Sequence, residues 1–200
     1  MSSPHDAGVS ASRGDQVTAI IVPVVETLCG RAVERLRGSG LTSISVAICA
    51  DAHLVALVYA SDARALALYG LESGLGEGPS SAAFGETRPL LIADLGSHSV
   101  AAFPVFATQS PTADVRSICA IPLISGRIAV GVLTVSGAEP AELSDAVVSE
   151  LLSLADAVLV ALLTDTASSG ERPGARAIDG AANVTHQAAG MIMVQLVSCA

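Results

Sequence analysis

The segment 74–95, GLGEGPSSAAFGETRPLLIADL, constrains the fold more than any other part of the chain. The alternating glycines at its start allow backbone angles that are closed to other residues, and Pro79 fixes φ where a helix would begin. The pattern predicts a short helix over 80–86, which Pro89 ends because the residue before a proline avoids helical angles. The letters Leu-Leu-Ile-Ala at 90–93 then predict a buried strand.

The composition indicates one core domain with a small appendage. The chain has 200 residues, of which 51% are hydrophobic and only 2% aromatic, so the core is expected to be aliphatic. The formal net charge of −9 repels nucleic acid and anionic membranes at long range. This balance argues against a basic RNA-binding surface on the domain itself.

No targeting signal or membrane span is expected. The first residues, 1–15, are polar and lack an apolar run of the kind found in signal peptides. The most hydrophobic stretch, 143–163, contains Asp145, Glu150 and Asp156, which a membrane span would have to bury in lipid. The sequence therefore predicts a cytoplasmic protein with no membrane partner.

Hydrophobic periodicity predicts the remaining elements. Helices are expected at 17–36, 61–69 and 141–164, and strands at 41–50, 54–59, 116–124 and 128–135. Pro23 should kink the first helix or mark its start, and Ser61 or Asp62 should cap the second. Pro122 predicts an edge, a bulge or an unpaired position in its strand. Together these elements predict an α/β (α+β) fold with a central, mostly antiparallel sheet of about five or six strands and helices packed on one face.

The first and last of these helices carry more apolar surface than a sheet alone requires. In the first helix the expected stripe is Val17, Ile20, Ile21, Val24, Leu28 and Ala32. In the last, one row is Leu143, Val147, Leu151, Leu154, Val158 and Leu162, and a second face carries Leu152, Leu159 and Leu163. Two apolar faces need two partners, the sheet and another helix. That helix belongs either to the same chain or to a second copy, and a homodimer through 17–36 and 143–163 is the expectation.

Two stretches resemble the GAF domain of bacterial GAF–ANTAR regulators. The usual form of the first is close to GEGPC followed by a helix, RP, a strand and DL, as in segment 74–95. The second, RSICAIPLISGRIAVGVLTVSG, matches the RS-x-x-x-x-P-L pattern and the GVL strand of the family. Ser80 stands where that family often has cysteine, so any role of that cysteine is absent. The resemblance implies a small-molecule sensing module over 17–164.

The C-terminal letters VTHQAAGMIMVQL resemble the opening of an ANTAR domain, which often reads VHQATGMVMVQL. ANTAR domains bind paired RNA hairpins and block transcription termination, and a complete one continues for about two or three further helices, well beyond one helix of ordinary length. The matching positions include Val184, His186, Gln187, Gly190 and Met191. Because 181–200 carries no charged side chain, RNA is expected as a partner only if an ANTAR domain is completed.

These patterns divide the chain into four parts. Residues 1–16 are expected to be a disordered tail, 17–164 the GAF-like sensor, 165–180 a linker rich in Ser, Gly, Pro and Arg, and 181–200 a truncated ANTAR-like helix.

Catalysis and cofactors have little support in the sequence. No serine or cysteine lies in a recognised motif beside a base, and the four cysteines show no metal-binding spacing, so we expect no enzyme activity, no cofactor and no metal. The glycines of segment 74–95 do not supply a phosphate-binding motif. Two remote alternatives come from the family: haem bound by His98, and reduction of free methionine sulfoxide by Cys49 or Cys119.

A ligand pocket is implied by the resemblance, because GAF pockets lie over the sheet, under the loops between the third strand and the hairpin. The residues placed near its mouth are Phe84, His98, Phe103, Phe106 and Arg116, with Asp94 able to pair with Arg116 or to bind ligand groups. Each of the aromatic residues could equally pack as ordinary core.

The sequence as a whole predicts a signal-sensing regulatory protein whose family counterparts control antitermination through an ANTAR domain. The alternative is a ligand-binding or dimerisation module with no output of its own, because the ANTAR-like segment is cut short.

Overall fold

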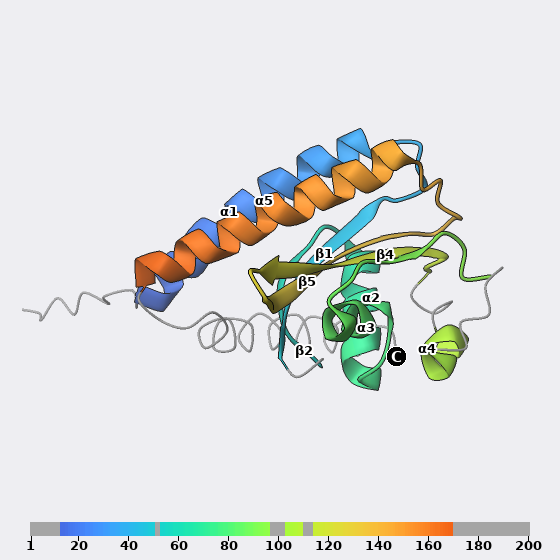
Figure 1. Cartoon of the computed structure of the whole chain (residues 1–200), viewed down its shortest axis with the longest axis horizontal. Coiled ribbons are helices and arrows are strands. Elements are labelled where there is room, and N and C mark those ends of the chain that lie inside the picture. Colours follow the sequence, from blue (N-terminus) through green and yellow to red (C-terminus); the bar gives the residue numbers. More distant parts are fainter. Residues whose placement is uncertain (1–12, 51–52, 97–102, 110–113, 170–200) are drawn as a thin grey trace, which may run out of the picture.

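The computed structural model describes residues 13–50, 53–96, 103–109 and 114–169. This part of the chain forms five helices and five strands (Figure 1). In chain order they are α1 (Arg13–Arg35), β1 (Ser43–Ala50), β2 (His53–Ala60), α2 (Ala63–Leu75), α3 (Pro79–Glu86), β3 (Leu90–Ile92), α4 (Pro104–Gln109), β4 (Ser117–Ser125), β5 (Ile128–Gly137) and α5 (Asp145–Ser169). The expected tail, the linker and the ANTAR-like segment lie largely or wholly outside the described residues.

The five strands form one antiparallel sheet in the order β2-β1-β5-β4-β3. The predicted central antiparallel sheet is therefore confirmed. The predicted hairpin is β4–β5, which turns at Gly126, where φ is +64°. β3 pairs with β4 only over Ile118–Ala120, so Pro122 lies where β4 has no neighbour on that side and needs no amide hydrogen.

Helices cover both faces of the sheet, whereas the sequence predicted packing on one face. α1 and α5 lie side by side and antiparallel across one face, and α2 and α3 lie on the other (Figure 1). We call these the α1–α5 face and the α2–α3 face. Neither α2 nor α3 shows a strong apolar periodicity in the sequence, so nothing there indicated that they also cover the sheet.

The core on the α1–α5 face is aliphatic, as expected from the composition. The strands contribute alternate side chains such as Ile44, Val46 and Leu133, and α5 contributes Leu151 and Val158. An ion pair between Arg35 and Glu150, with 2.9 Å between Nε and Oε1, joins the two helices. The predicted inner row of α5 is thus confirmed at its central positions.

The buried stripe of α1 agrees with the prediction only in part. Ala32, expected on the stripe, is fully buried, whereas Val24, also expected there, is 44% exposed, and Val25 and Cys29 are buried instead. The helix contacts both the sheet and α5, so residues beside the expected stripe are buried as well. α1 also begins earlier than expected, at Arg13, and runs through Pro23, where the Thr27 hydroxyl donates to the proline carbonyl at 2.8 Å.

Two further helix boundaries and the burial of one strand differ from the prediction. α2 continues past Gly70 to Leu75 and ends at Gly76, whose φ of +68° lets its N–H bond the Glu72 carbonyl. β3 was expected to be buried, but as an edge strand it leaves Leu91 37% exposed. The last helix begins at Asp145, after Ser144, whose hydroxyl accepts from Val147 N.

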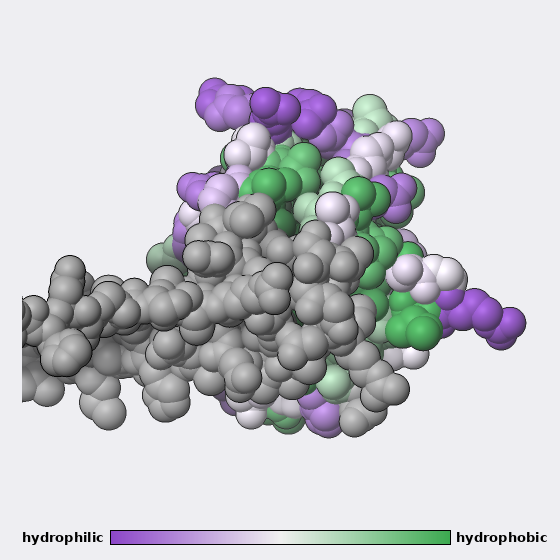
Figure 2. Space-filling view, turned by 90° about the vertical axis from the view of Figure 1, so that its left-hand side faces the viewer, coloured by the Kyte–Doolittle hydropathy of each residue, from purple (hydrophilic) through white to green (hydrophobic). Residues whose placement is uncertain are grey.

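One helix in the described part of the chain, α5 over Asp145–Thr164, is long and apolar enough to cross a membrane by length and composition alone. Only 28% of its apolar window is buried, and it packs on the sheet and on α1. Figure 2 views the end where the α1–α5 pair extends beyond the sheet, and hydrophobic residues reach the surface there between hydrophilic ones.

Candidate functional site

The α2–α3 face of the sheet is lined by small and hydroxyl side chains. Ser43 of β1 pairs with Ser136 of β5, and Ser45 pairs with Thr134 on the next position that shares this face. All four residues are buried, with at most 5% of their surface exposed. A row of buried hydroxyls in the centre of a sheet contrasts with the apolar core on the opposite face.

α3 lies directly over these hydroxyls. The hydroxyl groups of Ser80 and Thr134 are 2.8 Å apart and both buried. Gly78 and Pro79 start α3 here, as the glycine-proline pattern predicted. Beside Ser80, the hydroxyl of Ser81 is buried and has no hydrogen-bond partner among the described residues.

α2 adds a buried carboxyl to the same region. Glu72 is 1% exposed, and its Oε1 accepts a hydrogen bond from Ser80 N at 3.3 Å. The other oxygen, Oε2, has no hydrogen-bond partner among the described residues. Burial raises the pKa of Glu72 to about 7, and the hydrogen bonds from Ser80 lower it by a smaller amount.

The loop between α2 and α3 positions Glu77 against the start of α4. Gly76 ends α2 in the left-handed conformation, and Gly78 has a φ of +151°, which favours glycine. Between them, Glu77 Oε1 accepts hydrogen bonds from the backbone N–H groups of Val105, at 3.1 Å, and Phe106, at 3.0 Å. The loop therefore ties α4 to the α2–α3 face.

The three phenylalanines lie in two neighbouring clusters. Phe106 of α4 is fully buried against Leu68, Val115 and Ile118, with Phe103 packed beside it. Phe84 of α3 packs on a separate cluster that includes Cys49 and Ala83. The structure thus brings Phe103 and Phe106 together and places Phe84 in another cluster.

Asp94 and Arg116 form a bidentate ion pair. Arg116 Nη2 donates to both carboxylate oxygens, at 2.8 and 2.9 Å, and Nε donates to Oδ1 at 3.2 Å. The Gly96 N–H also donates to Oδ1 of Asp94, at 2.9 Å. Of the two roles considered from the sequence, pairing between these residues is the one the geometry shows. His98 lies outside the described residues.

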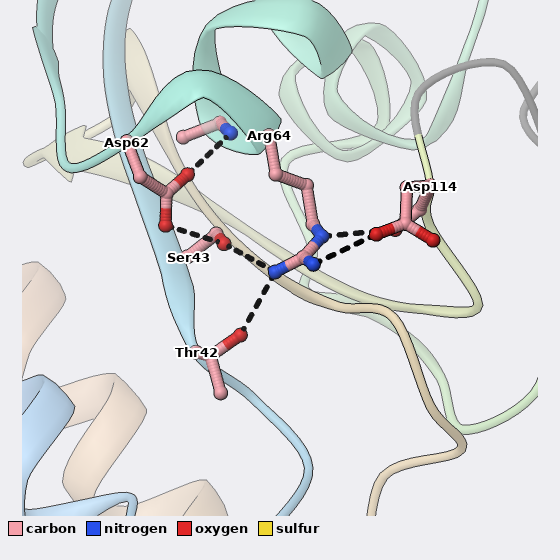
Figure 3. A network of polar contacts seen from close by, with 6 residues as sticks. Thr42, Ser43, Asp62, Arg64 and Asp114 are labelled. Atoms are coloured by element: carbon pink, nitrogen blue, oxygen red, sulfur yellow. Dashed lines mark hydrogen bonds and ion pairs between the residues drawn. The ribbon is translucent and has the colours of Figure 1, made fainter.

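A second arginine network, which sequence reasoning missed, joins three segments at one end of the sheet (Figure 3). Arg64 of α2 donates from Nη1 to the hydroxyls of Thr42 and Ser43, and from Nε and Nη2 to Asp114. Asp62 caps α2 by accepting from Ala65 N at 2.9 Å, as predicted, and its other oxygen accepts from the Ser43 hydroxyl at 2.7 Å. This network fixes α2 to the start of β1.

The candidate redox cysteines are far apart. Cys49 packs with Ala83 on the α2–α3 face, whereas Cys119 packs on the α1–α5 face. Cys119 pairs with Val135, but Ile48, the neighbour of Cys49, pairs with Gly131, so the two are on the order of 15 Å apart along the strands at about 3.4 Å per residue. A disulfide needs Cα atoms about 4.4–6.8 Å apart. Burial raises the pKa of both thiols to about 12.

Metal binding finds no support in the described ranges, where no group of three His, Cys, Asp or Glu residues lies close enough to hold an ion.

The sequence did contain one signal for the missed carboxyl. Glu72 falls on the same helical stripe as Ala65 and Leu68, at the spacing that α2 buries. An acidic residue on a buried stripe requires either a partner or protonation. By contrast, nothing in the sequence indicates that Glu77 caps α4 or that Arg64 reaches Asp114, because both contacts join segments far apart in the chain.

Comparison with known proteins gives matches at the level of structure. No family model matches the chain, and no curated protein matches it. The GAF domain region of a protein from Geobacter sulfurreducens PCA superimposes with a TM-score of 0.59 at 16% identity, over 76% of this chain and 99% of that one. A GAF domain/HD domain protein from Geobacter sulfurreducens gives 0.53 at 14% identity, over 78% and 99%.

A third similar structure is the type II free methionine-R-sulfoxide reductase from Thermoplasma acidophilum. It gives a TM-score of 0.52 at 14% identity, over 72% of this chain and 94% of that one. Similarity at such low identity establishes the fold alone. The antiparallel five-stranded sheet with helices on both faces and the agreement with these structures lead to one conclusion: the chain has the fold of GAF domains.

Proposed function

We propose that this protein is a small-molecule sensing regulatory module whose ligand binds on the α2–α3 face. The observation that carries the proposal is the chemical contrast between the two faces of the sheet. The α1–α5 face buries aliphatic side chains, whereas the α2–α3 face buries the hydroxyls of Ser45, Ser80 and Thr134 beside the carboxyl of Glu72. Buried polar groups cost stability unless they are hydrogen-bonded, so their concentration on one face favours a role in recognition.

The elements around this face suit a sensor. α4 is short, and the side chain of Glu77 accepts hydrogen bonds from two amides at its N-terminus. Phe106 anchors α4 to the same cluster as Leu68 of α2. A ligand that contacts α2, α3 or α4 would therefore change contacts shared by all three helices.

A thermal-shift screen tests the proposal. The full chain is mixed with amino acids, nucleotides, sugars and carboxylic acids, and a ligand that binds the folded state raises the melting temperature in a concentration-dependent way. Thr134→Val should abolish the shift, because it removes one hydroxyl of the candidate site. Thr27→Val, the same substitution on exposed α1, should preserve it. No shift with any compound, or an equal shift in both variants, would contradict the proposal.

We also propose that two copies of the chain associate into a homodimer through α1 and α5, which would transmit the signal. Leu152 and Val160 of α5 are 43% and 62% exposed, and Val24 of α1 is 44% exposed. Large apolar side chains gathered on two adjacent helices favour an interface with a second copy. Such an interface would place the sensing face on one side of the sheet and the dimer contact on the other.

The antitermination output of the resembling family extends this proposal to residues 184–196, which lie outside the described part of the chain. The resemblance supports a place among regulators that act on hairpin RNA. The absence of charge over 181–200 predicts that this chain by itself does not bind RNA at physiological salt. A gel-shift titration against a tandem-hairpin leader should show no complex. Salt-sensitive binding below one micromolar would instead mean that the acidic body or a partner completes the site.

A second candidate, reduction of free methionine sulfoxide, is suggested by one of the similar structures. The geometry disfavours Cys49 and Cys119 as a redox pair, because they lie on opposite faces of the sheet. We expect no sulfoxide reduction by the purified chain with dithiothreitol as reductant. Activity that Cys49→Ser or Cys119→Ser abolishes would support this second candidate.

A further inference from the structure

The carboxyl of Glu72 is enclosed in a way that ordinary surface glutamates are not. Helix α2 buries it together with Ala65 and Leu68. One oxygen accepts from Ser80 N at 3.3 Å, and the other has no hydrogen-bond partner among the described residues. A carboxylate normally accepts several hydrogen bonds, so this environment suits the neutral acid better than the anion.

The α2–α3 loop closes directly over this carboxyl. A Cβ atom on Gly78 would lie 2.7 Å from Cγ of Glu72 and 2.8 Å from Oε1, closer than such contacts occur. Glycine at this position, with φ at +151°, therefore lets the backbone rest on the glutamate side chain. A shift of that side chain toward Gly78 would therefore meet the backbone of the loop.

The same loop is connected to α4. The Gly76 N–H bonds the carbonyl of Glu72, and the adjacent Glu77 accepts from Val105 N and Phe106 N. Phe106, which belongs to α4, is fully buried. A movement that starts at Glu72 thus reaches the helix that carries Phe106 through a continuous set of contacts.

Few charged groups face Glu72. Cys49 of β1 lies near enough to interact with it electrostatically, and the ring of His53 of β2 lies near Gly76, 3.9 Å from a Cβ built there. α3 offers the amide and hydroxyl of Ser80, and the residues of α4, PVFATQ, include no titratable group. No arginine is among the groups that shift the pKa of Glu72, so no described cation offsets its ionisation.

We propose that Glu72 is a proton-operated latch. As the neutral acid, Glu72 keeps the 76–79 loop closed against α2. When Glu72 ionises, it releases the loop, the start of α3 and, through Glu77, the N-terminus of α4. The sensing face would thereby respond to intracellular pH independently of any ligand. Protonation favours the closed state because a neutral carboxyl tolerates burial that a carboxylate does not.

Proton linkage sets the direction in which pH shifts the equilibrium between the closed and open states. Burial raises the pKa of Glu72 from its usual 4.5 to about 7, so the closed state holds its proton more tightly than an open, hydrated state does. Protonation of Glu72 therefore stabilises the closed state relative to the open state in full below about pH 4.5. This stabilisation is lost progressively as the pH rises to about 7. The opening equilibrium should increase tens of fold between about pH 5 and 7.5 and then level off.

Hydrogen exchange on the full chain tests the latch. Exchange rates of the backbone amides of Ser80, Val105 and Phe106, corrected for the intrinsic pH dependence, are measured from pH 5 to 8. Protection should fall tens of fold over this range and exceed any change at the β5 amides, which report global unfolding. In Glu72→Gln, which resembles the neutral acid, protection at these amides should be independent of pH.

Glu77→Gln provides the matched control on the same loop. It should weaken protection at Val105 and Phe106 at every pH, while the pH dependence at Ser80 remains. Direct observation of the Glu72 carboxyl by side-chain ¹³C NMR in the wild-type chain keeps the test decisive if Glu72→Gln does not fold. A midpoint near 7 with parallel loss of protection supports the latch. A midpoint near 4.5, or protection that does not change with pH in the wild-type chain, overturns it.

Discussion

Arg64 and Asp114 are joined twice, although 50 residues separate them: Nε of the arginine donates to the Asp114 carbonyl at 2.9 Å, and Nη2 donates to its carboxylate at 2.8 Å. The other arm of the same guanidinium reaches the hydroxyls of Thr42 and Ser43 (Figure 3). Asp114 holds a φ of +54°, which is uncommon for a residue other than glycine. The arginine fork fixes this backbone at the point where the chain enters β4.

Arg64→Ala is expected to lower the free energy of unfolding by about 1 to 2 kcal/mol, because it removes the bonds to Asp114 and leaves the buried Ser43 hydroxyl with one partner fewer. The value stays small because the Asp114 side chain is 75% exposed to water. Arg64→Lys should lose most of the same energy, since lysine cannot form the fork. Urea unfolding measures both variants, and Arg37→Ala, which breaks an exposed pair, should leave stability unchanged.

Gly78→Ala is expected to destabilise the protein by more than about 2 kcal/mol, because it combines an unfavourable φ with a clash against Glu72. Gly70→Ala is the matched control: no atom lies within 4 Å of a Cβ built there. It should stabilise α2 by about 0.5 to 1 kcal/mol, since alanine favours helix more than glycine does. Equal effects of the two substitutions in thermal unfolding would contradict the described loop geometry.

Phe106→Ala should cost about 3 to 5 kcal/mol, because the side chain is fully buried beneath α4 and its removal leaves a cavity. Val105, its neighbour on the same helix, is 46% exposed, so Val105→Ala should cost well under about 1 kcal/mol. Chemical denaturation of both variants compares them directly. A small effect of Phe106→Ala would mean that Phe106 is not buried against Leu68, Val115 and Ile118 as described.

Much of this architecture could be predicted from the sequence, because the patterns that predict its helices and strands involve residues close together in the chain. Alternation of Ile44, Val46 and Ile48 with small residues predicted β1, and glycine followed by Pro79 predicted the start of α3. Pro122 predicted an edge, a bulge or an unpaired position, and the short pairing of β3 leaves it unpaired on that side. These patterns require no knowledge of how distant segments meet.

The candidate site could be predicted only in part. The aromatic residues were expected near the mouth of a pocket, and the structure places Phe103 and Phe106 in one hydrophobic cluster and Phe84 in another. The hydroxyl pairs depend on the register between β1 and β5, which joins Ser45 to Thr134. The roles of Glu72 and Glu77 depend on the path of the loop that joins α2 to α3. Such contacts arise from tertiary packing, which neither periodicity nor local motifs encode.

Val160→Asp should convert the proposed homodimer into a monomer, because it places a charge on the most exposed large apolar side chain of α5, which is 62% exposed. Ile128→Asp, at the β4–β5 turn, where the side chain is 68% exposed, should leave the dimer intact. Light scattering at tens of micromolar protein, a concentration that detects weak dimers, distinguishes the outcomes. A wild-type mass of 20 kDa would contradict the dimer.

Hydrogen exchange with a compound retained from the thermal-shift screen tests whether a small molecule binds on the α2–α3 face. The backbone amides of the full chain are compared with and without that compound at constant pH. Protection should increase at α2, α3, α4 and the centre of β5 around Thr134, with little change on the outer surface of α5. Protection confined to α1 and α5, with the amides of α2 and α3 unchanged, would contradict binding on that face.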